Sequence, residues 1–291
     1  MLIFLPFCRQ GNNMIIGAMN NPHKEIIEQI HSFGEMNFDY LELTLEYPHA
    51  SSWVVQKQKK RILDALSSYN LGLVAHFPWY FSISHPYEGI QKATNKEFEE
   101  VIKAAASLGA KKAVLHAEAS LSPSLQSNVN MVANTIKNLK SLKKYAEAEG
   151  VNLLIENTSN RACTIKEFKK IFSEVDIKMA LDIGHASLRG GAGFEEYVRE
   201  FSKKVAHVHL HDNFGFNDDH LPLGAGKMDV EAVVAKLKAF YDSTITLEVH
   251  SPDPHYLKYS RDMLEILWYG KKKFEDNKDY LYPDGYKPAK Y

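Results

Sequence analysis

The chain has 291 residues, of which 45% are hydrophobic and 24% are charged, as is typical of a globular protein with a large core. Its 35 basic and 36 acidic residues nearly cancel, which excludes a generally basic nucleic-acid-binding coat but not a local basic groove. The two cysteines are too few for a disulfide framework, and no apolar run reaches the roughly 18 residues of a membrane span, so we expect a cytoplasmic protein.

The first residues of the chain do not have the pattern of a signal peptide. Residues 1–7 are apolar, but they lack a basic start and are followed by the polar residues 9–13. Residues 14–18 are the first segment typical of a strand, so Met14 could be the true start. We expect one domain over residues 14–270, a short N-terminal extension over 1–13 and a charged, aromatic tail over 271–291.

Short apolar runs alternate with amphipathic segments along this domain. We expect the apolar runs to be β-strands over residues 14–18, 40–45, 72–76, 113–116, 152–156, 179–182, 205–209 and 244–248. We expect helices over residues 25–33, 59–69, 97–108, 129–149, 165–175, 230–240 and 257–268. Thr164 and Glu167 form a capping box at the start of one helix, and Asp229 is expected to cap another.

This alternation predicts a parallel sheet with helical crossovers. The number of strands in a chain of this length favours a single closed (β/α)8 TIM barrel over an open, doubly wound sheet. The phosphate-binding glycine motifs that would support the open sheet, G-x-G-x-x-G and G-x-x-x-x-G-K-[ST], do not occur in the sequence.

The last six predicted strands end in side chains that can bind a metal ion. These residues are His76, His116, Glu156, Asp182 with His185 close behind, a group of His207, His209 and His211, and Glu248. The active site of such a barrel lies at the carboxyl ends of its strands, so these side chains should converge in one pocket. Carboxylates packed together there would repel each other, and a divalent cation removes that penalty. The sequence therefore predicts a metal site.

The seventh strand places His207, His209 and His211 on one face. They cannot all be equivalent ligands, because successive members lie about 6.5 Å apart along a strand. We expect one to be a ligand, with His207 as a deeper structural residue, His211 near the rim beside the ligands, and Asp212 orienting a ligand. In the loop that follows, Asp218 and His220 are two residues apart, so both could face one ion.

At these residues the sequence resembles the xylose isomerase-like TIM barrel superfamily, which includes sugar and sugar-phosphate isomerases and epimerases and the endonuclease IV repair enzymes. The resemblance covers residues 14–268, and its most specific stretches are residues 155–158, 181–185, 209–212, 218–226 and 247–248. In the endonuclease IV branch three zinc ions share nine ligands. The resemblance implies a first ion on His76, His116 and Glu156, a second on Glu156, Asp182, His209 and Glu248, and a third on His185, Asp218 and His220. In the epimerase branch a single manganese-, cobalt- or magnesium-type ion uses only the second set.

The resemblance implies a divalent-metal-dependent sugar or sugar-phosphate isomerase or epimerase. In such an enzyme Glu156 and Glu248 would move a proton next to a carbonyl, and His185 would position a hydroxyl or act as an acid. We expect Trp79 and Tyr80 to form an apolar wall against the sugar, and Glu42 to contact the substrate near the mouth. Lys227, like Arg161 and Arg189, could hold a phosphate.

The alternative is an endonuclease IV-like AP endonuclease that hydrolyses DNA phosphodiesters with three zinc ions. The full nine-ligand set favours it, whereas the acidic Glu42 and Glu46 on the second strand would repel a phosphodiester backbone. A lyase that uses related chemistry and a barrel that binds a metal or sugar without turnover are further alternatives. We expect a small sugar as the partner rather than DNA or a membrane. A homodimer is possible.

Overall fold

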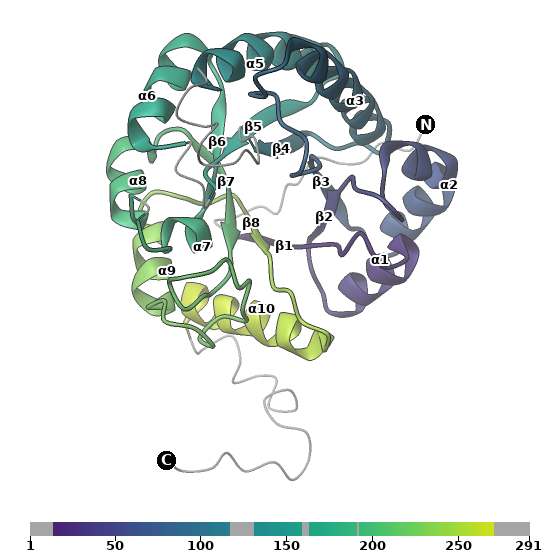
Figure 1. The fold of residues 1–291 in the computed structure, drawn as a ribbon. Coiled ribbons are helices and arrows are strands. Elements are labelled where there is room, and N and C mark those ends of the chain that lie inside the picture. Colours follow the sequence, from purple (N-terminus) through teal and green to yellow (C-terminus); the bar gives the residue numbers. More distant parts are fainter. Residues whose placement is uncertain (1–13, 117–130, 159–162, 191, 271–291) are drawn as a thin grey trace.

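The structure is a computed structural model that describes residues 14–116, 131–158, 163–190 and 192–270. Its parallel strands close into a barrel in chain order, with the last strand hydrogen-bonded to the first (Figure 1). The strands are β1 (Ile15–Met19), β2 (Tyr40–Thr44), β3 (Gly72–His76), β4 (Lys112–His116), β5 (Asn152–Glu156), β6 (Lys178–Asp182), β7 (Val205–Leu210) and β8 (Thr244–Leu247). The predicted α/β fold, a single (β/α)8 TIM barrel, is confirmed.

Helices form a ring around the barrel (Figure 1). They are α1 (Ile26–Glu35), α2 (Ser52–Ser68), α3 (Glu88–Ser107), α5 (Met131–Ala148), α6 (Ile165–Glu174), α7 (Ile183–Ala186), α8 (Phe194–Phe201), α9 (Val230–Lys238) and α10 (Pro254–Tyr269). The expected caps are present, because Thr164 and Glu167 form a capping box before α6 and the Asp229 side chain accepts a hydrogen bond from Ala232 N. No helix among the described residues is long and apolar enough to cross a membrane.

Some helix limits differ from the expected ones. The helix α3 begins at Glu88, earlier than expected, because its first turns are mainly polar and give little apolar periodicity. The helix α2 begins at Ser52, so that Trp53, Val54 and Val55 belong to its first turn. The helix α8 was not expected, although Phe194, Tyr197 and Phe201 are spaced to bury one face. The expected extension over residues 1–13 and tail over 271–291 lie outside the described residues.

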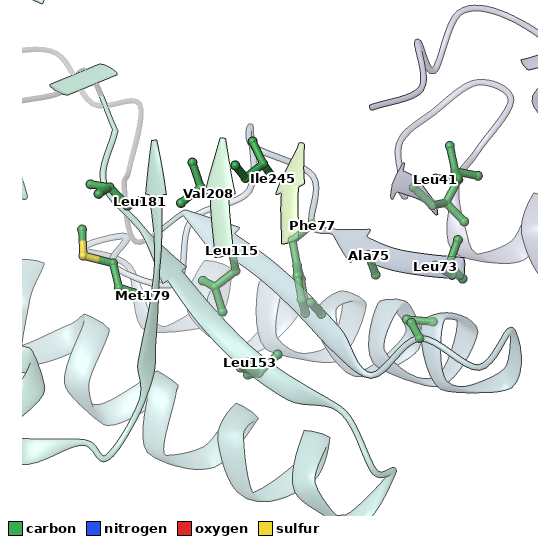
Figure 2. Packing of buried hydrophobic residues seen from close by; sticks show 14 of the residues in the cluster. Leu41, Leu73, Ala75, Phe77, Leu115, Leu153, Met179, Leu181, Val208 and Ile245 are labelled. Carbon is green, nitrogen blue, oxygen red and sulfur yellow. The ribbon is translucent and has the colours of Figure 1, made fainter. Parts of the chain in front are cut away.

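Side chains of each strand alternate between the barrel interior and the layer under the helices. Leu41, Leu115, Leu181, Val208 and Ile245 belong to the apolar cluster that packs the strands against the helices (Figure 2). A smaller cluster is separate from it and consists of Tyr40, Val74, Val114, Leu154 and Ala180. The polar strand residues fall in phase with this second set, so the apolar alternation itself directs them into the barrel.

Candidate metal centre and active site

A cavity of about 710 Å³ opens at the carboxyl ends of the strands. The expected ligands that line it are His76, His116, Glu156, His185, Asp218, His220 and Glu248. The other two, Asp182 and His209, are fully buried beside this set. The structure thus brings all nine residues of the expected ligand set into one continuous cluster.

Glu156 lies at the centre of the inner part of this cluster. Its Oε2 is 3.2 Å from His76 Nε2 and 2.9 Å from His116 Nε2. Its Oε1 is 3.1 Å from His209 Nδ1, which is also 3.0 Å from Glu248 Oε1. One carboxylate therefore joins the donors expected for the first ion to those expected for the second.

The outer part of the cluster is built around Asp218, in the loop between β7 and α9. Its Oδ2 lies 2.8 Å from His185 Nε2 and 3.3 Å from His220 Nε2. His185 belongs to the short helix α7, which follows β6 directly. The Asp182 side chain caps this helix by accepting a hydrogen bond from His185 N and so positions His185 at the strand end. These are the three donors expected for the third ion.

Backbone contacts fix the orientation of three imidazole rings in this cluster. The Nδ1 atoms of His76, His185 and His220 lie 2.8, 3.0 and 2.9 Å from the carbonyl oxygens of Phe77, Asn157 and Glu248 respectively. A carbonyl oxygen can only accept, so each Nδ1 carries a proton and each Nε2 faces a carboxylate. In the neutral ring that Nε2 holds a lone pair, which is the form of histidine that binds a metal ion.

The electrostatics of the cluster demand positive charge. Burial would lower the pKa of His220, but the neighbouring Asp218 and Glu248 outweigh it and raise the pKa to about 9. Burial would raise the pKa of Glu156, but His209 and His116 outweigh it and hold that pKa well below its usual range. The carboxylates are thus stable only beside cations, which protons on the imidazoles or metal ions can supply.

Buried atoms without partners point to the same requirement. Of the six buried side-chain atoms without a hydrogen-bond partner among the described residues, two lie in this cluster, Asp182 Oδ2 and His211 Nε2. Buried polar atoms are almost always paired, and an ion is one of the few reasons for an exception. The donor set of imidazoles and carboxylates suits zinc, manganese or a similar divalent ion. The residues present therefore fit a metal centre.

The expected substrate contact of Glu42 is wrong, because Glu42 is fully buried and does not line the cavity. It pairs with Val74 on β3, two residues before the end of that strand, so it lies too deep to reach the mouth. Its Oε1 accepts from His209 Nε2 at 3.1 Å, and its Oε2 accepts from His207 Nε2 at 2.9 Å. Glu42 therefore holds the His209 ring with Nδ1 directed at Glu156 and Glu248.

Replacing Glu42 by glutamine should weaken metal binding by about 10- to 100-fold, because the variant loses the charge that orients His209 and increases its basicity. Competition with a chelator of known affinity measures the change. Glu46→Gln is the matched control, since Glu46 also lies in the β2 region but contacts Thr44 rather than a histidine of the cluster. Equal metal affinity in Glu42→Gln and the unaltered protein would contradict this role.

His207 occupies the deep position expected of it. Its Nδ1 contacts Thr244 Oγ1 at 2.7 Å, and that hydroxyl also accepts from Lys112 Nζ at 2.9 Å. Burial lowers the pKa of His207 to about 4, although the Glu42 carboxylate opposes the shift. A neutral, buried His207 is thus part of the hydrogen-bonded floor beneath the candidate metal centre.

The other expected substrate contacts divide into two groups. Trp79 lines the cavity and is 58% exposed, as an apolar wall requires. Tyr80 instead lines a neighbouring groove, where its ring packs against Phe81. Lys227 is exposed and lies over the Phe216 ring, as Arg189 does, and neither lines the cavity. Arg161 lies outside the described residues.

Sequence reasoning named Glu46 on the second strand but missed Asn20 and Thr44, which lie at the ends of the first two strands. Asn20, Thr44 and Glu46 line the same cavity as the candidate ligands, and Thr44 pairs with His76 on the neighbouring strand. The Thr44 backbone N–H donates to Asn20 Oδ1 at 2.7 Å, and the Thr44 hydroxyl donates to Glu46 Oε1 at 2.8 Å. Polar residues at the carboxyl ends of the other strands were predicted to face the active site. The same rule, applied to the ends of β1 and β2, would have identified these residues as well.

Asp212 organises the loop that carries two of the outer donors. Its carboxylate accepts hydrogen bonds from four backbone N–H groups, at 2.8 to 3.0 Å, of Asn213, Gly224, Gly226 and Met228. A β-carbon at Gly226 would lie 2.3 Å from Asp212 Oδ1, so the close approach requires glycine there. An isolated antiparallel bridge pairs Asp212 with Leu221. Asp212 therefore fixes the loop on both sides of Asp218 and His220.

Comparisons with known proteins agree with this fold. Two uncharacterized proteins of Methanocaldococcus jannaschii are similar in sequence. MJ1311 is 29% identical over 239 residues, which cover 77% of this chain and 79% of that protein. MJ1614 is 30% identical over 181 residues, which cover 60% of this chain and 70% of that protein.

Several solved structures share the barrel. A D-tagatose 3-epimerase-like protein has a TM-score of 0.75 and 24% identity, and the match covers 87% of this chain and 97% of that one. An L-ribulose 3-epimerase has a TM-score of 0.70 and 18% identity, and the match covers 92% of this chain and 99% of that one. The 3-keto-D-glucoside 4-epimerase from E. coli has a TM-score of 0.71 and 17% identity, and the match covers 87% of this chain and 99% of that one. A family model described as xylose isomerase-like TIM barrel matches residues 29–267, so the chain belongs to that family.

Proposed function

We propose that this protein is a divalent-metal-dependent isomerase or epimerase of an unphosphorylated sugar. The observation that carries the proposal is the pair of buried carboxylates at the cavity, Glu156 and Glu248, whose Oε1 atoms lie 3.1 and 3.0 Å from His209 Nδ1. The names of the structural neighbours, an L-ribulose 3-epimerase, a 3-keto-D-glucoside 4-epimerase and a D-tagatose 3-epimerase-like protein, agree with it.

The inner donors Glu156, Asp182, His209 and Glu248 would hold the reacting metal ion. When bound, such an ion supplies a Lewis acid that polarises a carbonyl oxygen and stabilises negative charge on it. Glu156 and Glu248 then have the proton-transfer role, because a carboxylate beside the carbon next to the carbonyl can take its proton and return it. Burial would raise the pKa of both carboxyl groups, but neighbouring histidines outweigh it and hold each pKa below its usual range. Both groups are therefore ionised and available as bases.

The cavity favours a neutral sugar over a sugar phosphate. Among the described residues that line it there is no lysine or arginine, and the buried Glu46 adds a negative charge to its wall. Recognition of phosphate depends on cationic side chains or on helix N-termini. The exposed Trp79 and the polar Asn20 and Thr44 instead suit the apolar face and the hydroxyls of a sugar.

Phosphodiester hydrolysis is the second candidate, because every one of the nine donors expected for three zinc ions is present in the cluster. The described residues that line the cavity include no lysine or arginine, which argues against it, since a DNA backbone needs positive partners.

The test is solvent exchange in D2O. The purified protein is loaded in turn with manganese, cobalt, magnesium or zinc and incubated with free ketoses and aldoses, their phosphates, and a DNA duplex containing an abasic site. We expect deuterium to enter a free sugar next to its carbonyl, detected by NMR, and Glu248→Gln to prevent it. Cleavage of the abasic DNA without sugar exchange would contradict the proposal, as would exchange confined to the phosphates.

A further inference from the structure

His211 lies within the metal cluster rather than at its rim. The side chain is fully buried, and its Nε2 is 3.4 Å from Asp182 Oδ1 and 3.5 Å from Asp218 Oδ1 without a hydrogen bond to either. Its Nδ1 contacts the Asp212 carbonyl oxygen at 3.4 Å, so the proton of the neutral ring belongs on Nδ1. The Nε2 lone pair then faces two carboxylates, an arrangement that is favourable only around a cation.

The fold makes specific room for this ring. A β-carbon at Gly184 would lie 2.1 Å from His211 Nε2, so only glycine in α7 allows the imidazole to occupy its place. Asn213 Nδ2 donates to the Gly184 carbonyl oxygen at 2.9 Å, which fixes α7 against the end of β7. The His211 ring also stacks on His220, with centroids 4.0 Å apart. The position of His211 is therefore held from several sides.

The outer donor atoms have the spacing that a small ion requires. One ligand atom from each of His185, His211, Asp218 and His220 lies within 4.8 Å of all the others. Donors in a tetrahedral zinc site lie about 2.0 to 2.2 Å from the ion, and hence roughly 3.4 Å from each other. The Asp218 oxygens are 3.3 Å from His220 Nε2 and 3.5 Å from His211 Nε2.

We propose that His211 is a ligand of the outer metal position, and that it completes with His185, Asp218 and His220 a four-donor site for a structural zinc ion. Zinc held by four protein ligands is characteristic of structural sites, whereas catalytic zinc keeps a position open for water or substrate. The outer ion would tie the loop after β7 to the end of β6 and would exchange slowly. This inference rests on the metal binding proposed above, but not on the sugar reaction.

A consequence concerns the two candidate reactions. An outer ion with four protein donors has no free position for a phosphate oxygen, so hydrolysis shared among three zinc ions would lose one of its participants. The outer set of His185, His211, Asp218 and His220 uses none of the inner donors, although His211 Nε2 lies 3.4 Å from the inner donor Asp182. A closed outer site is thus compatible with sugar isomerisation at the inner ion.

The experiment measures zinc retention and cobalt spectra in the full chain. The protein, His211→Ala and His250→Ala are loaded with zinc, treated with a chelator, and sampled over time for bound zinc by elemental mass spectrometry. His250 is the matched control, because it stacks on His220 at 4.2 Å and lines the cavity but belongs to none of the donor groups. Parallel samples loaded with cobalt(II) report the coordination number through their visible absorption.

We expect the unaltered protein and His250→Ala to retain one slowly exchanging zinc ion and to give the intense visible bands of tetrahedral cobalt. In His211→Ala the affinity for that ion should fall by at least about a hundredfold, the upper end of the loss seen when only an indirect partner is removed. The intense bands should weaken. Asp218→Asn, which preserves side-chain shape, should give the same loss.

Unchanged zinc retention and an unchanged cobalt spectrum in His211→Ala would overturn the inference. Thermal unfolding in excess chelator separates a folding defect from a ligand loss: the metal-free forms should melt alike, and only the zinc-induced increase in melting temperature should disappear. Sugar exchange in the same samples separates the two proposals. If deuterium enters the sugar but the protein holds no slowly exchanging zinc, only the structural site is refuted. If the protein holds slowly exchanging zinc but no deuterium enters the sugar, only the proposed reaction is refuted.

Discussion

Replacement of Glu156 by glutamine should lower the rate of sugar proton exchange by at least about a thousandfold. General acid–base catalysis by a positioned group typically contributes between 10² and 10⁴ in rate, and here the same change also removes a metal donor. Glu156 contacts His76, His116 and His209, so no other side chain can replace both of its oxygens. The rate of deuterium incorporation under saturating metal and sugar measures the loss.

Metal content distinguishes the two causes of this loss. If Glu156→Gln holds less metal, raising the metal concentration should recover part of the rate, whereas the missing proton-transfer group cannot be recovered. Glu174→Gln is the control, because this carboxylate pairs with Lys140 on the outside of the barrel and should leave the rate unchanged. A Glu156→Gln variant with more than a tenth of the original rate would contradict the assigned role.

Asp212→Ala should reduce the free energy of unfolding by about 3 to 5 kcal/mol, because it leaves several backbone N–H groups of the β7–α9 loop without their acceptor. The expected decrease is large because Asp212 is fully buried and water cannot easily replace the carboxylate. Chemical denaturation of the metal-free protein measures it, since the effect does not depend on a bound ion.

The same variant should also lose the outer donors, because Asp218 and His220 depend on this loop for their position. Asp219→Ala is the matched control from the same loop, since the Asp219 carboxylate accepts from the single backbone N–H of Phe214 at 3.2 Å. We expect a change below about 1 kcal/mol for that control. If both variants unfold at the same denaturant concentration, Asp212 is not the anchor of the loop.

The contrast between Glu42 and Glu156 explains how far strand patterns can predict a site. Both follow the inward-facing alternation of a barrel strand, but only Glu156 stands at the strand end. The register between neighbouring strands sets the height of each residue in the barrel, and periodicity along one strand carries no information about that height. A carboxylate expected at the mouth is therefore found as the partner of His207 and His209.

His211 and Tyr80 show the same limit for residues beyond the strands. His211 was expected beside the ligands, yet the space over Gly184 and the folded loop place its Nε2 among the carboxylates. Tyr80 was expected beside the sugar with Trp79, but its ring turns toward Phe81 and a second groove. In both cases contacts with residues distant in the sequence decide the direction of the side chain.

The sequence by itself determined the barrel and which polar side chains converge at its mouth. Apolar runs alternating with amphipathic segments leave few alternatives to eight parallel strands, and strand ends at residues such as His76, Glu156 and Glu248 must then face one mouth. Only the tertiary structure decided which histidine nitrogen faces the site, how deep Glu42 lies, and how Asp212 fixes its loop. The physical reason is that these properties depend on hydrogen bonds and close packing between segments far apart in the chain.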